Sequence, residues 1–502
     1  MLWGHRIRSP RGAACLGFGM MNRNHPVLVS IAVLFLAALT AGWAPARPNL
    51  LFILVDDWGW RDVGYRGSTF YETPEIDQLA EEWARFDHCY TASPMCSPTR
   101  ISILTGRGPE RHGVTQWLAG SERAFTREGE AARVFCPKPQ SSGIAAGEVT
   151  LGEALAEAGY ATAFYGKWHL GSFKATGGPA NHGFGEQVAV IEANRCAMFH
   201  PFRGVDYFPG SGAGDHYGDL LTDAAIEFVS ARREAPFYLH LCYFSMHAPI
   251  ASKPGMRAKF AKKAAGLPGL EADRTLQDHS HKPQKLRQDD AEYAGQLATL
   301  DRNIGRLVQA LKEARKLDDT IIFLTGDNGG RSCFFQGHPT SNQPLRAGKT
   351  FLFEGGLRTP LLVHWPGNSK PGSTCDVPVT SVDFFPTILE MLGLPARPGQ
   401  HLDGVSFASL FRGEELARDT FYWHFPHYQA EGSYPSSAIR KGRYKLIHDY
   451  HHDDGILFDL EADPEEQRDL SAARPELAAE LKRELLGRLE ETGAYIPMPR
   501  SE

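Results

Sequence analysis

The sequence lacks any pair of cysteines in the Cys-x-x-Cys spacing that is typical of zinc sites and thiol–disulfide exchange sites. Its 8 cysteines are spread singly along 502 residues, so neither kind of site is expected. No asparagine stands in an Asn-x-Ser/Thr acceptor for N-glycosylation. Lys and Arg (53) do not outnumber Asp and Glu (59), and the net charge of −6 argues against nucleic acid as a partner.

The sequence also lacks an apolar run of membrane-spanning length near its start. The run from Val27 to Gly42 is shorter than the roughly 20 residues that a spanning helix needs. Arg23 precedes it, and the small-residue stretch Ala44-Pro45-Ala46 follows it, which is the pattern of a secretory signal peptide. An uncleaved anchor or a buried helix would be the alternatives. We therefore predict that residues 1–46 are a signal peptide with an N-terminal extension, and that the protein has no stable membrane span.

The predicted location of the protein follows from the signal-peptide pattern and from the lack of N-glycosylation acceptors. Export would permit disulfides, although spacing does not choose among the pairings of the six cysteines other than Cys15 and Cys96. Export without glycosylation acceptors favours a bacterial periplasmic or secreted protein over a lysosomal one that is sorted by its glycans.

Four apolar segments predict buried parallel strands, each followed by polar residues. They lie within residues 48–59, 159–171, 235–249 and 318–330. Helical patterns precede two of them, at residues 150–159 and 293–314, and another helix is expected at 382–393. This alternation predicts an α/β fold with a large, mixed, mostly parallel sheet flanked by helices. We place this catalytic domain at residues 47–400.

The hydrophobic pattern of the sequence changes after about residue 400. Short segments at 420–425, 438–449 and 455–460 are typical of antiparallel strands, and residues 475–491 form an amphipathic helical pattern. We therefore predict a smaller α+β C-terminal domain, an antiparallel sheet plus a helix, at residues 401–502.

Residues 251–288 form a long polar stretch with nine Lys or Arg and three acidic residues. A solvated surface insertion is the simpler interpretation. The alternative is a lid, or a groove for an anionic polymer.

Carboxylates follow two of the predicted strands. Asp56 and Asp57 follow the first strand, and Asp327 and Asn328 follow the fourth. The carboxyl ends of parallel strands meet at one edge of a sheet, which is where ligands bind in such folds. Three clustered carboxylates need a cation, and hard oxygen ligands favour Ca²⁺ or Mg²⁺ over Zn²⁺. Capping or turn formation by each aspartate separately is the structural alternative.

Cationic and imidazole side chains lie at the same predicted edge. Lys167 and His169 follow the second strand, His247 follows the third, and Lys349 lies in a glycine-rich loop after the fourth. Together they could bind a tetrahedral oxyanion and stabilise charge on a transferring group. Taken singly, each lysine would more often be a solvated surface residue, and each histidine a structural one.

Cys96 opens the motif Cys-Ser-Pro-Thr-Arg at what we predict to be the start of a helix. Pro98 would suit the first helical position, which places Cys96 at or just before the cap. There the helix dipole favours an anionic nucleophile, and Arg100 lies one turn further along. A thiolate, however, is a soft group that matches a hard Ca²⁺ ion poorly.

The motifs in this order resemble those of the type I sulfatase family, which is arylsulfatase-like and belongs to the alkaline-phosphatase-like superfamily. The resemblance spans about residues 48–472. It is carried by CSPTR with ISILTGR, then GKWHLG, MHAP, TGDNGG, LRAGKTFLFEGGLRTP, and finally GRYKLI and LFDLEADPEEQRDL. In that family a maturation enzyme oxidises the motif cysteine to formylglycine during export. The resemblance implies this change at Cys96, and a hydrated aldehyde supplies the hard hydroxyl groups that suit Ca²⁺.

The resemblance also implies a role for each site residue. Metal ligands would be Asp56, Asp57, Asp327, Asn328 and the oxygen that replaces the sulfur of Cys96. One hydroxyl of the hydrate would attack sulfur with Asp327 taking its proton, and His169 would take the proton when the enzyme-bound sulfate is expelled. The remaining catalytic residues would be Arg100 and Lys167 on the hydrate, Lys167, His247 and Lys349 on the sulfate, and His247 as acid for the leaving alcohol.

The resemblance predicts a sulfuric ester hydrolase that acts on a sulfated carbohydrate or an aryl sulfate. A phosphate or phosphonate monoester hydrolase of the same superfamily is the first alternative, and a noncatalytic carbohydrate-binding relative is the second. The sequence does not define the substrate side of the site, for which Arg331, His338, His424 and His427 are the candidates.

Overall fold

The computed structural model describes residues 47–118, 132–137, 141–171, 177–191, 196–202, 208, 210–269, 274–275, 283–333 and 339–500. All of them belong to one compact unit, Arg47–Glu502. The predicted signal peptide and His338 lie outside these residues. Within them, every helix is too short or too polar to cross a membrane. Among the cysteines that they include, Cys89, Cys96, Cys196, Cys242, Cys333 and Cys375 are free thiols.

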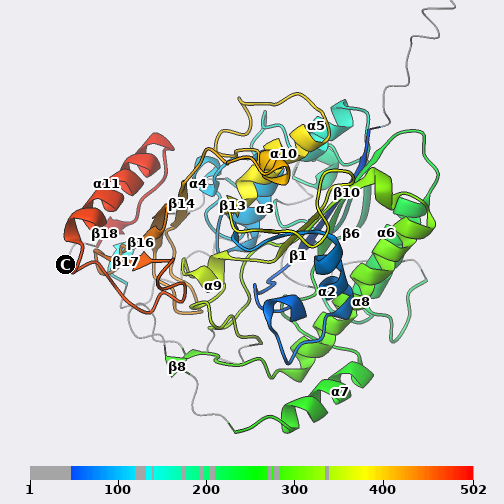
Figure 1. The fold of residues 1–502 in the computed structure, drawn as a ribbon, viewed down its shortest axis with the longest axis horizontal. Helices are drawn as coiled ribbons and strands as arrows, with labels where there is room; N and C mark the ends of the chain where they lie inside the picture. The colour runs from blue at the N-terminus through cyan, green and yellow to red at the C-terminus, as the bar shows by residue number, and fades with distance from the viewer. Residues whose placement is uncertain are drawn as a thin grey trace, which may run out of the picture. The chain divides into compact units, whose positions relative to one another are not determined.

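The chain alternates strands and helices through its first three quarters (Figure 1). The strands up to β13 are β1 (Asn49–Val55), β2 (Ala84–Phe86), β3 (Cys89–Tyr90), β4 (Val134–Phe135), β5 (Ala161–Lys167), β6 (Glu186–Ile191), β7 (Phe237–Tyr243), β8 (Arg274–Thr275), β9 (Pro283–Gln284), β10 (Thr320–Gly326), β11 (Leu361–His364), β12 (Thr374–Cys375) and β13 (Val379–Thr380). The helices up to α10 are α2 (Pro74–Glu82), α3 (Cys96–Thr105), α4 (Pro109–His112), α5 (Leu151–Glu157), α6 (Tyr217–Ser230), α7 (Pro254–Ala265), α8 (Ala291–Glu313), α9 (Glu354–Leu357) and α10 (Phe384–Met391).

The main sheet has eight strands in the order β12-β2-β11-β10-β1-β7-β5-β6. The run β10-β1-β7-β5-β6 is parallel throughout, and β11 pairs antiparallel with both β10 and β2. The predicted mixed, mostly parallel sheet is therefore confirmed. All four strands predicted from the sequence lie in the parallel run, so their carboxyl ends meet at one edge.

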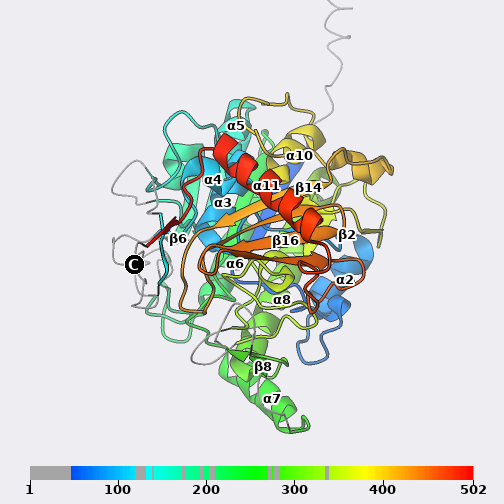
Figure 2. The same cartoon turned by 90° about the vertical axis from the view of Figure 1, so that its left-hand side faces the viewer.

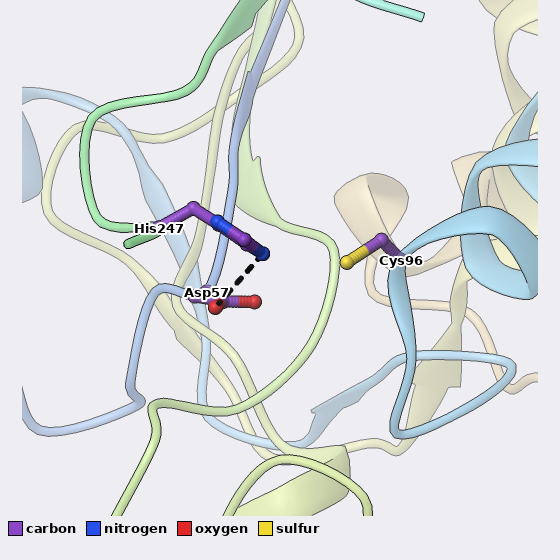
Figure 3. Close-up of side chains that lie close together, drawn as sticks. All are labelled: Asp57, Cys96 and His247. Carbon is purple, nitrogen blue, oxygen red and sulfur yellow. Dashed lines mark ion pairs between the residues drawn. The ribbon is translucent and has the colours of Figure 1, made fainter. Parts of the chain in front are cut away.

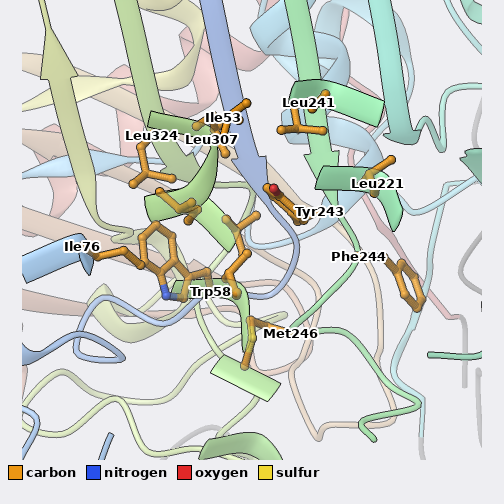
Figure 4. Close-up of a cluster of buried hydrophobic side chains, with 14 of the residues drawn as sticks. Ile53, Trp58, Ile76, Leu221, Leu241, Tyr243, Phe244, Met246, Leu307 and Leu324 are labelled. Carbon is orange, nitrogen blue, oxygen red and sulfur yellow. The ribbon is translucent and has the colours of Figure 1, made fainter. Parts of the chain in front are cut away.

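Helices cover both faces of this sheet, which explains why the strands are apolar without alternation. In β1, Leu51, Ile53 and Val55 pack toward α2, α6 and α8, whereas Leu50, Phe52 and Leu54 pack toward α3, α5 and α10. Figure 4 shows part of the first layer, where side chains of β1, β7 and β10 meet Ile76 of α2, Leu221 of α6 and Leu307 of α8. Side chains that face both ways fix the sheet, and with it the edge where the polar clusters gather.

A second, antiparallel sheet follows in the order β14-β15-β16-β17. Its strands are Thr420–Phe425, Ser436–Lys441, Tyr444–Asp449 and Asp454–Asp459, and α11 (Pro475–Glu491) and β18 (Met498–Pro499) complete the chain. The predicted antiparallel sheet plus helix is confirmed. Leu481, Leu485 and Leu489 of α11 pack on one face of the sheet, and Figure 2 shows the helix lying across the strands.

The other face of this small sheet shares a core with the segment that carries Cys96. Trp423 of β14 is buried, its ring lies 5.3 Å from that of Tyr90, and its Nε1 donates to Thr91 O at 2.8 Å. Met95 and Cys96 belong to the same apolar cluster. The second sheet therefore supports the active-site segment directly.

We expect Trp423→Ala to lower the free energy of unfolding by about 3–5 kcal/mol, because it removes a fully buried indole from this shared core. Trp423→Phe should lower the free energy of unfolding by less, because it keeps an aromatic ring in the core. It still removes the hydrogen-bond donor to Thr91 O. Urea-induced unfolding of the three proteins measures the effect. A Trp423→Ala variant as stable as the parent would contradict the shared core.

The polar stretch at 251–288 contains a helix, α7, that the sequence pattern did not predict. Its Phe260 is buried against Phe70, while Lys259 and Lys263 both pair with Glu72. The simpler interpretation, a surface insertion, fits the described part of the stretch, because α7 buries Phe260 and leaves most of its other side chains exposed. Residues 270–273 and 276–282 are outside the described residues.

Candidate active site

The polar clusters predicted at the strand ends lie together in the structure. One ligand atom each from Asp56, Cys96 and Asp327 lie within 4.8 Å of one another, and the same holds for Asp57, Cys96 and His247. Figure 3 shows Asp57 and His247 on one side of a common space and Cys96 facing them from the start of α3. Residues up to 271 positions apart therefore form one buried site.

The carboxylates are fixed by the backbone of two neighbouring strand ends. Asp57 has the left-handed φ of 55°, and its backbone N donates to Asp327 Oδ1 at 3.0 Å. Asn328 Nδ2 donates to Asp57 Oδ1 at 2.9 Å. A positive φ at a residue with a side chain costs about 1–3 kcal/mol, so the surrounding contacts must hold Asp57 in this conformation.

Three cationic side chains lie among these carboxylates. Lys167 Nζ donates to Asp56 Oδ2 at 2.6 Å, and Lys349 Nζ donates to Asp57 Oδ1 at 2.5 Å and to Cys96 Sγ at 3.5 Å. Arg100 holds Asp327 Oδ2 from Nε at 2.8 Å and donates from Nη1 to Lys167 O at 2.6 Å. Lys167 is fully buried, which excludes the solvated-surface alternative for this lysine.

Both predicted histidines reach the site. His247 Nδ1 donates to Ala248 O at 2.6 Å, which leaves Nε2 facing Asp57 Oδ2 at 3.9 Å. His169 also has a positive φ, 60°, and neither of its buried ring nitrogens has a hydrogen-bond partner among the described residues. A buried, unpartnered imidazole is costly, so this ring is suited to a ligand that hydrogen-bonds to it.

Cys96 is the first residue of α3, and Met95 is its N-cap. The prediction that Pro98 occupies the first helical position is wrong, because it is the third residue of the helix. Proline is tolerated there since the first four N–H groups of a helix lack intrahelical acceptors. Arg100 lies one turn beyond Cys96, as predicted, and the thiol faces the positive end of the helix dipole.

The pKa values of the site reflect burial and the crowding of charges. Burial and the neighbouring Asp56 raise the pKa of Asp327 to about 6. Burial also acts to raise the pKa of Asp57, but the charges of Lys349, His247 and Lys167 outweigh it and hold that pKa well below its usual range. Burial raises the pKa of the Cys96 thiol to about 12, and it lowers the pKa of His169 and of His247 well below the usual value.

Three oxygens in the site fit a cation. Asp56 Oδ1, Asp57 Oδ2 and Asn328 Oδ1 are buried and have no hydrogen-bond partner among the described residues. The other oxygens of Asp56 and Asp57 are already held by Lys167 and Lys349. Two carboxylate oxygens and one amide oxygen, none of them hydrogen-bonded within the described part of the chain, form a donor set for a hard divalent ion such as Ca²⁺.

Two family models match most of the chain. The family model described as Sulfatase matches residues 48–394, and that described as N-sulphoglucosamine sulphohydrolase, C-terminal, matches residues 347–493. This protein belongs to the sulfatase family. The predicted resemblance is confirmed, and the sulfatase is a sulfuric ester hydrolase that cleaves sulfate esters.

Relatives match the sulfatase over most of its length. Human arylsulfatase A is 30% identical over 89% of this chain and 89% of its own. Human N-acetylgalactosamine-6-sulfatase is 30% identical over 76% of this chain and 69% of its own. A solved structure in complex with its substrate D-glucosamine-2-N,6-O-disulfate is 25% identical, with a TM-score of 0.65 over 89% of this chain and 97% of that one.

The predicted substrate-side residues have different outcomes. His424 is buried, and both ring nitrogens are engaged, by Ser437 Oγ at 2.7 Å and Tyr495 O at 3.1 Å, so the substrate role predicted for it is wrong. His427 is also buried and bonds to Thr115 Oγ1 at 2.8 Å, which indicates a structural role. Arg331 pairs with Glu431 at 3.5 Å and its charge acts on Asp57, so its role in substrate binding stays a prediction.

Asn342, which was not predicted from the sequence, joins two loops of the site. Its Nδ2 donates to Gly330 O and Ala347 O, both at 2.9 Å, so it holds the loop after β10 against the loop that carries Lys349. A lone asparagine in a loop has no periodicity or motif, so no sequence signal marks this contact.

Proposed function

We propose that the sulfatase removes sulfate from a sulfated carbohydrate by means of a formylglycine made from Cys96 and a bound Ca²⁺ ion, with Mg²⁺ as the alternative ion. The observation that carries this proposal is the convergence on Cys96 of unpaired carboxylate oxygens from one side and of Lys349 from another. Such a site attracts a hard cation and an oxyanion together, and it requires a hard nucleophile between them.

The residues that would hold the ion are Asp56, Asp57, Asp327 and Asn328, completed by the oxygen that replaces the sulfur of Cys96. The ion would supply Lewis-acid polarisation of a sulfate oxygen and would favour the ionised form of the nucleophile. The hydrated aldehyde would supply the attacking hydroxyl, and a second hydroxyl through which sulfate can later be released. Arg100 and Lys167 would orient that group, because they hold Asp327 and Asp56, the two carboxylates that lie beside Cys96.

The remaining residues would bind the sulfate and move protons. Lys167, Lys349 and His247 surround the space in front of Cys96, so they would bind the sulfate oxygens and stabilise the charge of the transition state. A carboxylate oxygen of Asp327 would accept the proton of the attacking group. His247 Nε2 would donate a proton to the leaving alcohol, since the incoming anion favours the charged imidazole. A ring nitrogen of His169 would accept the proton that is lost when sulfate departs.

The carbohydrate part of the proposal is supported by the relatives. One is named for an N-acetylgalactosamine 6-sulfate, and one solved structure holds a glucosamine 2-N,6-O-disulfate. Amino sugars sulfated at O6 are therefore the first natural substrates to test, with simple aryl sulfates as assay substrates. Maturation by a formylglycine-generating enzyme and export to the periplasm or the medium belong to the same proposal, and they are supported by the signal-peptide pattern in residues 1–46.

A panel of esters that share one leaving group tests the reaction class. We expect kcat/KM for an aryl sulfate to exceed that for the matching aryl phosphate and aryl phosphonate, and N-acetylgalactosamine 6-sulfate and glucosamine 6-sulfate to be turned over. A preference for the phosphate or phosphonate would favour the alternative, a phosphate or phosphonate monoester hydrolase. Binding of sulfated sugars without any turnover would favour a noncatalytic carbohydrate-binding protein.

A further inference from the structure

The loop Arg346–Gly355 determines where the Lys349 ammonium lies. Its two ends are joined, because Gly355 N donates to Arg346 O at 2.9 Å. A Cβ atom at Gly355 would lie 2.5 Å from Ala347 O and from Arg346 O, so only glycine allows this closure. From the closed loop Lys349 reaches both Asp57 and Cys96.

The loop contains a strained backbone. Ala347 and Thr350 have φ of 59° and 76°, the left-handed region that side-chain-bearing residues rarely adopt. Each such residue costs about 1–3 kcal/mol and persists only where the surrounding contacts enforce it. Some contacts come from the catalytic domain, because Lys349 N donates to Gly330 O and Thr350 N to Pro94 O. These contacts hold the middle of the loop, so other contacts must hold its two ends.

A single residue of the C-terminal region contacts both ends of the loop. Glu466 Oε2 accepts from Glu354 N at 2.7 Å, and Glu466 O accepts from Arg346 Nη1 at 2.7 Å. Glu466 is fully buried and itself has a φ of 54°. It follows β17, more than 100 residues away along the chain, so it joins the two parts of the molecule at this loop.

The charge of Glu466 is balanced from the second sheet. Lys445 of β16, which is fully buried, donates from Nζ to Glu466 Oε1 at 2.8 Å and to Glu354 Oε1 at 2.9 Å. Glu354 Oε2 in turn accepts from Tyr90 OH at 2.7 Å. Tyr90 lies in the same apolar cluster as Cys96. The network therefore extends from the second sheet to both the Lys349 loop and the Cys96 segment.

We propose that Glu466 is a positioning residue for catalysis: it clips both ends of the Arg346–Gly355 loop and thereby sets where Lys349 meets the sulfate group. The proposal rests on the proposed function in that it takes Lys349 as a sulfate-binding residue. A displacement of about 1 Å in a positioned group can reduce the rate on the order of 10²-fold. A small shift of the loop, and with it of Lys349, would therefore be enough to slow catalysis.

The test uses variants of the full-length protein that separate the clip from general stability. Glu466→Gly removes the carboxylate, keeps the carbonyl that Arg346 uses, and suits the positive φ, which favours folding. Glu466→Gln is the conservative variant, because it keeps an acceptor for Glu354 N, although its amide group loses the hydrogen bond from Lys445 Nζ. Arg346→Met breaks the other end of the clip. Glu465→Ala, at the exposed neighbouring position, is the matched control.

The readouts are sulfate inhibition, turnover and amide hydrogen exchange. For Glu466→Gly and Arg346→Met we expect inorganic sulfate to inhibit at least about 10-fold more weakly and kcat/KM for an aryl sulfate to fall about 10- to 100-fold. Exchange should rise in peptides covering 346–355 and stay unchanged in β15 and α11. Glu465→Ala should resemble the parent in all three, and Glu466→Gln should lie closer to the parent than Glu466→Gly in each.

Two results would overturn the clip. One is a folded Glu466→Gly protein with unchanged loop exchange and unchanged sulfate inhibition. The other is exchange that rises evenly across the second sheet, which would indicate a purely structural role. If the parent protein turned over no sulfate ester, the proposed function would have failed, and the exchange pattern in the variants would still decide whether Glu466 holds the loop.

Discussion

Replacement of Cys96 by alanine lowers kcat/KM for sulfate esters on the order of 10⁴- to 10⁶-fold, the scale seen when a covalent nucleophile is removed. The reason is that the other described side chains around Cys96 act as cations, metal ligands or proton carriers in the proposed mechanism, and none of them takes over its nucleophilic role. In the proposed mechanism Lys167, His247 and Lys349 bind the sulfate, and all three remain in the variant, so the loss should fall on kcat and leave sulfate inhibition largely intact. Steady-state kinetics with an aryl sulfate measures both quantities.

Cys375→Ala is the matched control for this substitution. Cys375 is a half-buried free thiol on the edge strand β12, outside the site. Its variant should keep parental kinetics. Activity of Cys96→Ala close to that of the parent would contradict the assignment of Cys96 as the source of the nucleophile, whatever the state of the other cysteines.

We expect removal of divalent ions to lower kcat by at least about 10³-fold and added Ca²⁺ to restore it. Without an ion, one oxygen each of Asp56, Asp57 and Asn328 has no hydrogen-bond partner among the described residues. Two carboxylates about 4 Å apart repel by roughly 4 kcal/mol at an effective dielectric constant of 20, so the site should also lose stability. Dialysis against a chelator, followed by activity and thermal-unfolding measurements, tests both effects.

A ligand that binds only the folded protein stabilises it by about 2.7 kcal/mol at 100 times its Kd. Added Ca²⁺ should therefore raise the Tm of the stripped protein. Asn328→Leu should weaken that response, because it removes a neutral oxygen without changing the charge. Asn368→Leu, at an exposed position, should leave it intact. Full activity and an unchanged Tm after complete removal of calcium and magnesium would contradict a metal-dependent site.

The strand ends were predictable because topology alone brings them together. β1, β5, β7 and β10 are mostly apolar without a polar alternation and are covered on both faces, so their sequences identify them as parallel strands. Polar residues that follow parallel strands must gather at one edge, so the sequence alone predicts that Asp56, Lys167, His247 and Asp327 share one site.

The supporting contacts were not predictable in the same way. Glu466 and Asn342 are single polar residues in loops, and their partners lie far away along the chain, so neither periodicity nor a local motif marks them. The prediction for His424 of β14 failed in the opposite way, because it gave a structural residue a role in substrate binding. His424 seemed available for a substrate, yet a buried imidazole in an antiparallel sheet readily finds partners, here Ser437 and the backbone of Tyr495.

Mass spectrometry of the Cys96-containing peptide from fully active protein tests the central claim most directly. The account predicts an aldehyde at position 96: a peptide that lacks the sulfur, that reacts with a hydrazine probe, and whose abundance rises and falls with activity when the maturation enzyme is supplied or withheld. A fully active preparation in which residue 96 is entirely unmodified cysteine would contradict the account.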